Sequence, residues 1–254
     1  MFTLSDGYQI HYESHGSGEP IVLVHGWGAD AHSNWHATGW VSALSAIRTV
    51  ITLDVRGHGQ SDKPHEEAPY SYAAMSADVL RVMDAFGADQ CDFLGYSMGA
   101  FMGAWLLGHH PRRFGRMILG GIGNESEESA AMGEVIAQAL RATDPAKAHP
   151  YGRSVRQFVE ILPHNDLQAL ACSAARMWPE GWPAEVAGPG ASQATLPILI
   201  VNGEDDEPYV SSAHSFAETL PDARVEILPG CDHLSAVSNS RFKDVVLEFL
   251  SAPC

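Results

Sequence analysis

Ser97 stands between two glycines, Gly95 and Gly99, in a Gly-x-Ser-x-Gly pattern typical of a nucleophilic serine. A serine hydroxyl is a weak nucleophile unless it is held exposed, beside a base and next to hydrogen-bond donors that can stabilise an oxyanion. A sharp turn between a strand and a helix holds it in this way, and flanking glycines relieve the crowded backbone because they lack a Cβ atom. The pattern also occurs by chance in unrelated proteins, so the rest of the chain must decide its meaning.

The residues on either side of Ser97 fit such a turn. Residues 91–94 form a short, largely apolar run, as a central parallel strand does. Residues 100–107 are rich in helix formers, and Gly103 would let the helix approach the sheet closely. The sequence therefore predicts a buried strand before Ser97 and a helix after it.

Strands and helices alternate along most of the chain. A hairpin is predicted around Asp6-Gly7. Continuous aliphatic runs predict buried strands at residues 20–24, 48–53, 117–119, 197–201 and 224–228. Helices are predicted at residues 39–46, 72–86, 211–220 and 242–250. This alternation predicts an α/β fold with a doubly wound, mostly parallel sheet covered by helices on both faces.

The segment from residue 124 to about residue 195 breaks the alternation. It is rich in Ala, Glu and Pro, and it contains helical patches at residues 135–140, 155–162 and 167–177 without a convincing strand. We interpret residues 124–195 as a helical cap inserted between the sixth and seventh strands of a core domain. The core domain then comprises residues 1–123 and 196–254.

Four of the predicted strands end in polar loops, and ligands of such sheets bind beyond the carboxyl ends of the strands. These loops are His25-Gly26-Trp27-Gly28, the turn at Ser97, Gly203-Glu204-Asp205-Asp206, and Gly230-Cys231-Asp232-His233. They supply a serine, an acid and a histidine in the chain order Ser97, Asp206, His233, which is the order of a catalytic triad on one known fold.

At this point the chain resembles the α/β-hydrolase family over nearly its full length. The resemblance rests on the HGWG segment at residues 25–28, the DVRGHGQSD loop at 54–62, GYSMG at 95–99, and the two late loops. It implies Ser97 as nucleophile, His233 as general base and later acid, and an aspartate that orients the imidazole. The family pattern Gly-x-x-Asp, counted from Gly203, selects Asp206 rather than its neighbour Asp205.

The resemblance also implies an oxyanion hole made by the backbone N–H groups of Trp27 and Met98. The expected activity is that of a cofactor-independent serine hydrolase that cleaves carboxylic esters through an acyl-enzyme. A serine nucleophile argues against haloalkane dehalogenases and epoxide hydrolases, in which the family places an aspartate at this turn. Lactone opening, C–C bond hydrolysis, thioester cleavage and perhydrolysis remain open. A non-catalytic ligand-binding protein of the same fold is the alternative from another class, and the complete triad weighs against it.

Apolar side chains of the predicted cap have two interpretations. They can line a pocket for the acyl or alcohol part of a small-molecule ester or lactone, or they can form the small core of the cap itself. The candidates are Trp178, Trp182, Met132, Met177 and Phe158.

Histidines outside the triad are interpreted as structural or exposed. His25 and His58 stand in glycine-rich loops of the family pattern, and we expect both to be structural. His32 and His36 lie four residues apart and could bind a metal ion from one face of a helix, but the sequence shows no third ligand. We therefore predict neither a metal nor a cofactor.

Charge and composition exclude several other classes of function. The net charge of −16 comes from acids spread over 254 residues, whereas nucleic acids and anionic membranes attract clustered Lys and Arg. No apolar run approaches the length of a membrane span, and the first residues do not look like a signal peptide. The four cysteines show no C-x-x-C spacing, so a reducing cytoplasm is the expected setting. The sequence does not specify an oligomeric state.

Overall fold

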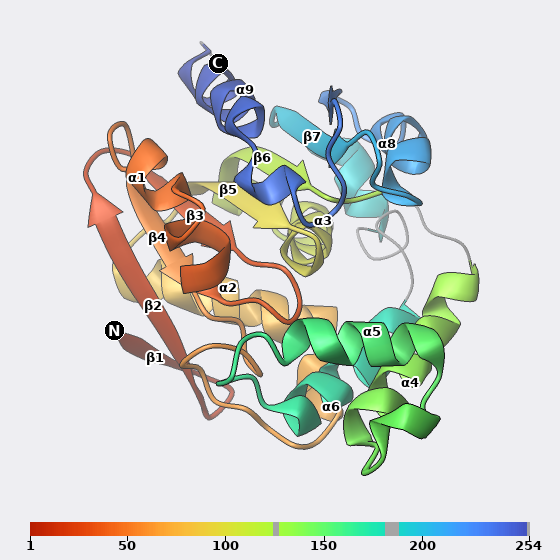
Figure 1. Cartoon of the computed structure of the whole chain (residues 1–254). Helices are drawn as coiled ribbons and strands as arrows, with labels where there is room; N and C mark the ends of the chain where they lie inside the picture. Colours follow the sequence, from red (N-terminus) through yellow and green to blue (C-terminus); the bar gives the residue numbers. More distant parts are fainter. Residues whose placement is uncertain (124–126, 181–187, 253–254) are drawn as a thin grey trace.

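The computed structural model describes residues 1–123, 127–180 and 188–252, and its central feature is an eight-stranded sheet (Figure 1). The strand order is β1-β2-β4-β3-β5-β6-β7-β8. The strands β1 and β2 run antiparallel to their neighbours, and every pairing from β4 through β3 to β8 is parallel. The predicted mostly parallel α/β sheet is therefore confirmed.

The strands are β1 (Phe2–Ser5), β2 (Tyr8–Gly16), β3 (Pro20–Val24), β4 (Thr49–Leu53), β5 (Cys91–Tyr96), β6 (Phe114–Gly120), β7 (Ile198–Gly203) and β8 (Ala223–Leu228). The α-helices are α1 (Trp40–Leu44), α2 (Tyr72–Phe86), α3 (Met98–His109), α4 (Glu127–Arg141), α5 (Pro150–Val159), α6 (Leu167–Met177), α8 (Tyr209–Ala217) and α9 (Ser240–Ser251). A π-helical segment, η1, spans His32–His36. It lies before the helix predicted at residues 39–46, and the sequence analysis did not predict it.

Helices cover both faces of the sheet, and the central strands are buried on both sides. In β3, Val22 and Val24 belong to the core beneath α2, α3 and α8. The alternate residues Ile21 and Leu23 belong to the core beneath α1 and α9. This alternation follows from the two-residue period of a strand, and it explains why β3 reads as a continuous apolar run.

The first hairpin turns where the sequence predicts it. Asp6 and Gly7 both have positive φ angles, 49° and 85°, as a tight two-residue turn requires. The strand β2 extends beyond this hairpin, and its residues Tyr12–Gly16 pair with β4. Its side chains His11, Glu13 and His15 are alternate residues of one strand and therefore share one face.

The helices α4, α5 and α6 lie beside one another between β6 and β7 of the sequence (Figure 1). Their apolar faces form a separate small core that contains Ile136, Leu140, Val159 and Leu170. Within residues 127–180 the structure contains no strand, in agreement with the predicted helical character of this segment. Among the described helices, none combines the length and the apolar character needed to cross a membrane.

Candidate active site

Ser97 occupies a strained turn between β5 and α3. Its φ and ψ angles are 51° and −119°, a conformation that a residue with a side chain adopts only when the surroundings enforce it. Both flanking glycines are required by space. A Cβ atom on Gly99 would lie 2.0 Å from the carbonyl oxygen of Val24, and one on Gly95 would lie 2.4 Å from that of Gly99. The turn thus holds Ser97 at the carboxyl end of β5, with its N–H donating to Gly120 at 2.8 Å.

Asp206 and His233 lie together at the neighbouring strand ends. Nδ1 of His233 is 2.9 Å from each carboxylate oxygen of Asp206. Asp206 is 2% exposed, and the side chain of His233 is about one-third exposed. Asp205, by contrast, is exposed to solvent. An imidazole bound through Nδ1 turns its Nε2 away from the acid, which is the arrangement of a histidine that exchanges a proton with another group.

The two loops that carry these residues are joined to each other. The N–H of Asp205 donates to the carbonyl of Cys231 at 2.9 Å, and the carboxylate of Glu204 accepts from the N–H of Gly230 at 2.9 Å. In the histidine loop, Asp232 accepts hydrogen bonds from the backbone and the hydroxyl of Ser235. These bonds lower the pKa of Asp232 below its ordinary value.

Tyr96 connects the histidine loop to the serine turn. Its hydroxyl donates to the carbonyl oxygen of His233 at 2.7 Å, and the two rings are 5.5 Å apart. Burial raises the pKa of Tyr96 well above its ordinary value, so the hydroxyl stays protonated and remains a donor. Because Tyr96 precedes Ser97, this bond fixes the histidine loop against the residue next to the serine.

The loop after β3 brings Trp27 and the turn after Ser97 to the same place. The N–H of Gly26 donates to Asn34 at 3.0 Å, and Nε1 of Trp27 donates to the hydroxyl of Ser173 at 2.8 Å. Met98 is the first residue of α3, where a backbone N–H has no partner within its own helix. Trp27 and Met98 both border a cavity at Ser97.

That cavity is small and largely apolar. Its free volume is about 20 Å³, and it is lined by Trp27, Tyr72, Ser97, Met98, Phe101, Met177, Trp178 and Tyr209. Of the predicted pocket residues, Trp178 and Met177 border it. Met132 and Phe158 are not among the described lining residues, and Phe158 instead lies near Gly28 with 36% of its surface exposed. Trp182 lies outside the described residues.

Sequence reasoning missed Tyr72, Phe101 and Tyr209 as lining residues. Tyr72 and Phe101 belong to the apolar faces of α2 and α3, where core packing explains an aromatic residue equally well. The position of Tyr209 in the sequence was more informative. Tyr209 follows Asp206 by three residues, so it had to lie close to the end of a strand. Its ring lies 5.2 Å from that of His233.

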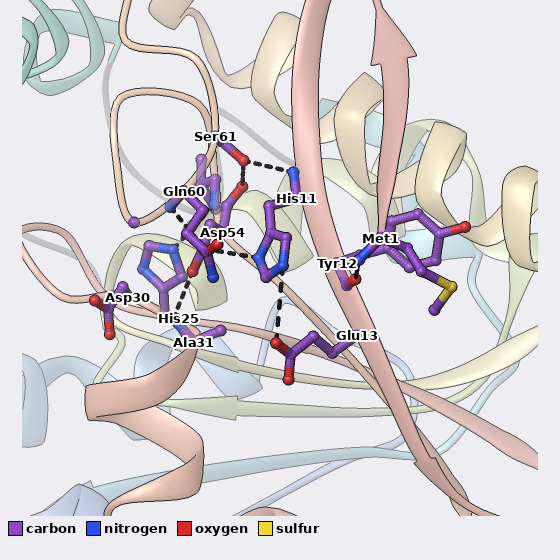
Figure 2. A network of polar contacts seen from close by, with 12 residues as sticks. Met1, His11, Tyr12, Glu13, His25, Asp30, Ala31, Asp54, Gln60 and Ser61 are labelled. Carbon is purple, nitrogen blue, oxygen red and sulfur yellow. Dashed lines mark hydrogen bonds and ion pairs between the residues drawn. The ribbon is translucent and has the colours of Figure 1, made fainter.

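The glycine-rich loop after β4 is held by buried polar contacts. Arg56 donates two hydrogen bonds to the buried carboxylate of Asp78. Asp54 accepts hydrogen bonds from the N–H groups of Ala31 and Gln60 (Figure 2). His25 accepts from the N–H of Val55 at 3.0 Å. Burial lowers the pKa of His25, so its imidazole is held neutral.

His58 is fully buried in the same loop. Its Nδ1 lies 3.1 Å from the carbonyl oxygen of Arg56, and burial lowers its pKa from 6.5 to about 3. Its role is therefore to fix backbone rather than to transfer protons near neutral pH. The buried thiol of Cys91 is similarly inert, because burial raises its pKa to about 12. Cys231 is buried next to the amide of Asn239.

A family model for the alpha/beta hydrolase fold matches residues 19–146, which span the loop after β3, the glycine-rich loop and the serine turn. The chain belongs to the α/β-hydrolase fold family. Its sheet order and the position of the serine turn after β5 agree with this assignment.

Known proteins that are similar to this chain have different names. A crystal structure of a hydrolase from Pseudomonas aeruginosa PA01 is 29% identical, covers 99% of this chain and 98% of its own, and gives a TM-score of 0.81. The 2-hydroxymuconate semialdehyde hydrolase of Pseudomonas sp. strain CF600 is 25% identical over 98% of this chain and 92% of its own length. The dihydrolipoyllysine-residue acetyltransferase component of the acetoin cleaving system of Cupriavidus necator is 28% identical over 98% of this chain and 68% of its own length.

Proposed function

We propose that this α/β hydrolase cleaves carboxylic esters of small molecules through Ser97, His233 and Asp206. The observation that carries the proposal is the contact between the buried carboxylate of Asp206 and Nδ1 of His233. The loop that contains His233 is hydrogen-bonded to Tyr96, the residue before Ser97. This combination would supply an oriented base for a half-buried serine that is held in a strained conformation.

The reaction proceeds in two halves. The hydroxyl oxygen of Ser97 attacks the ester carbonyl while Nε2 of His233 takes the hydroxyl proton. The tetrahedral intermediate then expels the alcohol, which receives that proton from His233, and leaves an acyl-enzyme. Water attacks the acyl carbon with His233 again as base, and the carboxylic acid departs as Ser97 regains its proton. Asp206 stabilises the imidazolium in both halves.

The negative oxygen of each tetrahedral intermediate is bound by the backbone N–H groups of Met98 and Trp27. Met98 begins α3, so the partial positive charge of the helix N-terminus adds to its hydrogen bond. Trp27 follows Gly26, whose own N–H is occupied by Asn34. The fixed loop keeps the Trp27 donor in position before substrate arrives.

Residues 124–195 act as a cap over this site in our proposal. Ser173 of α6 accepts the hydrogen bond from the indole of Trp27, and Met177 and Trp178 border the same cavity as Ser97. The indoles of Trp27 and Trp178 meet edge to face, with ring centres 5.5 Å apart. The cap thereby shapes the acyl pocket and excludes water from it.

Lactones and C–C bonds are the alternatives within the same chemistry, since both are cleaved by the same nucleophile, base and oxyanion donors. The similarity to a 2-hydroxymuconate semialdehyde hydrolase supports including that compound as a substrate. The similarity to an acetyltransferase component supports testing an alcohol or thiol as acceptor in place of water. A panel of p-nitrophenyl esters of graded acyl length, lactones and this semialdehyde decides among them.

A non-catalytic ligand-binding protein is the alternative from another class. A fluorophosphonate probe labels only an activated serine, so we expect the folded chain to be labelled. The label should vanish in Ser97→Ala and persist in Ser154→Ala, whose serine is exposed on α5. A folded parent that resists the probe would favour the binding protein. We place the enzyme in the cytoplasm, in keeping with the free cysteines at Cys91, Cys172 and Cys231.

A further inference from the structure

Three side chains from two separate elements, β2 and η1, come together outside the cavity at Ser97. Glu13 and His15 project from one face of β2, and His36 is the last residue of η1. One ligand atom from each lies within 4.8 Å of the other two. The sequence showed only the pair His32 and His36, because the strand that supplies the other two residues is distant in the chain.

We propose that Glu13, His15 and His36 bind one late first-row divalent metal ion, with Zn²⁺ as the representative. Two imidazoles and one carboxylate are the protein ligand set of many sites for such ions. An ion bound by three protein ligands keeps at least one further coordination position for water or a small anion.

The distances suit an ion of this size. Ligand atoms at about 2.0–2.1 Å from a tetrahedral metal are separated from each other by about 3.3 Å. Oε2 of Glu13 lies 3.3 Å from Nε2 of His15 and 3.6 Å from Nε2 of His36. The two imidazole rings are nearly perpendicular, with centres 5.0 Å apart. Small side-chain rotations therefore bring all three atoms within bonding distance of a single ion.

Two further histidines lie against the proposed ligands. The ring of His32 stacks on that of His36, with ring centres 5.8 Å apart. Nε2 of His11 lies 3.7 Å from the Glu13 carboxylate (Figure 2). Both histidines therefore support the orientation of the proposed ligands.

The site borders a second cavity, which has a free volume of about 380 Å³. Its wall contains Glu13 and His36 together with His11, Asp30, His32, Asp54, Gln60 and His164. The open position of the ion can therefore exchange ligands with solvent. The cavity is separate from the one at Ser97, since no residue borders both. The metal is thus not required for the proposed ester chemistry, and either proposal can fail without the other.

The test is a calorimetric titration of Zn²⁺ into the full-length chain, after a chelator has stripped it and any histidine tag has been removed. We expect one ion per chain and a rise in the unfolding temperature when Zn²⁺ is present, because the ion binds the folded state. A parent whose Kd for Zn²⁺ is weaker than about 100 µM, a binding free energy near 5.5 kcal/mol, overturns the proposal.

Variants assign the ion to this site. His15→Gln and His36→Gln should each weaken Zn²⁺ binding at least about tenfold, since even loss of groups that merely support a ligand costs that much. His15 is 39% exposed at its side chain, so its variant is expected to fold even if His36→Gln does not. The matched control is the double variant His109→Gln/His110→Gln, which removes two exposed histidines elsewhere and should bind as the parent does. Equal affinity of His15→Gln and the parent would place the ion elsewhere and refute the site.

Discussion

Nδ1 of His233 lies 2.9 Å from both carboxylate oxygens of Asp206, whereas the adjacent Asp205 is exposed to solvent. The two aspartates are neighbours in sequence, but the turn after β7 directs only one of them inward. The amide of Asn202 fixes the start of this turn, because it bonds to both the N–H and the carbonyl of Ile122 in the segment after β6. Asn202 belongs to β7, so the sheet itself positions the turn that carries Asp206.

This difference predicts opposite outcomes for two isosteric changes. Asp206→Asn should lower kcat on the order of 10⁴-fold, because an amide favours the wrong imidazole tautomer. Asp205→Asn should stay within about tenfold of the parent, a change of at most 1.4 kcal/mol in the activation free energy. Steady-state kinetics with an activated ester measure both. Reversed effects would show that Asp205 is the functional acid.

Replacement of Ser97, the proposed nucleophile, provides the second prediction. Ser97→Ala should lower kcat by about 10⁶-fold, as removal of a triad serine does. The fold should be retained, because alanine is smaller than serine and the glycines that permit the turn remain in place. Circular dichroism and the unfolding midpoint check the fold, and turnover within tenfold of the parent would refute the role of Ser97.

The serine turn also predicts a strong steric effect. Gly99→Ala should prevent folding or destabilise the protein severely, since its Cβ would lie 2.0 Å from a backbone oxygen that cannot move without the strand. The matched control is Gly87→Ala at the end of α2. Gly87 has a φ of 86° and no neighbouring atom within 4 Å of a Cβ, so only the left-handed backbone cost of about 1–2 kcal/mol applies. Similar unfolding midpoints for the two variants would contradict the close approach of Gly99 to the carbonyl oxygen of Val24.

The sequence predicted the sheet well because its signals are local. Continuous aliphatic runs mark β3, β4 and β7 as buried strands, and the two glycines around Ser97 mark the turn. The residues that line the two cavities were harder to predict. Tyr72 and Phe101 look like core residues in sequence, and Glu13, His15 and His36 come together only through the packing of η1 against β2. No local pattern encodes such a meeting.

Buried histidines predict how stability depends on pH. His58 has a pKa of about 3 in the folded protein and 6.5 as its ordinary value, so the unfolded chain binds a proton first as the pH falls. Above about pH 6.5 His58 is neutral in both states, so its titration costs the folded protein no stability. Between about pH 6.5 and pH 3 the unfolded chain is protonated and the folded one is not, so stability falls progressively with the pH. His58 alone should lower the free energy of unfolding by about 2 kcal/mol between pH 7 and pH 5. The lowered pKa of His25 acts in the same direction.

Denaturant unfolding at several pH values measures this slope. His58→Asn removes the titrating group and keeps a donor for the Arg56 carbonyl, so its stability should depend less steeply on pH than that of the parent. The exposed His214 provides the control, since His214→Gln should leave the slope nearly unchanged. Identical slopes for parent and His58→Asn would show that His58 is not the source.

The small cavity at Ser97 predicts a preference for short acyl groups. Its free volume of about 20 Å³ is only slightly more than one water molecule needs. An acetyl group can enter with minor movement, whereas an octanoyl chain must displace the side chains that surround it. We therefore expect kcat/KM to be higher for p-nitrophenyl acetate than for p-nitrophenyl octanoate. A higher value for the octanoate would show that the small free volume of this cavity does not limit the acyl length.

Replacement of Trp178 should change this preference for short acyl groups. Its indole borders the cavity and meets Trp27 edge to face, so Trp178→Ala opens space directly beside the acyl position. The ratio of octanoate to acetate kcat/KM should rise at least about tenfold, equivalent to 1.4 kcal/mol between the two transition states. Phe158→Ala removes an aromatic ring from α5, but Phe158 does not border the cavity, so the ratio for this variant should match that of the parent. If Phe158→Ala changed the ratio and Trp178→Ala did not, the acyl chain would run toward Gly28 and α5 instead of toward α6.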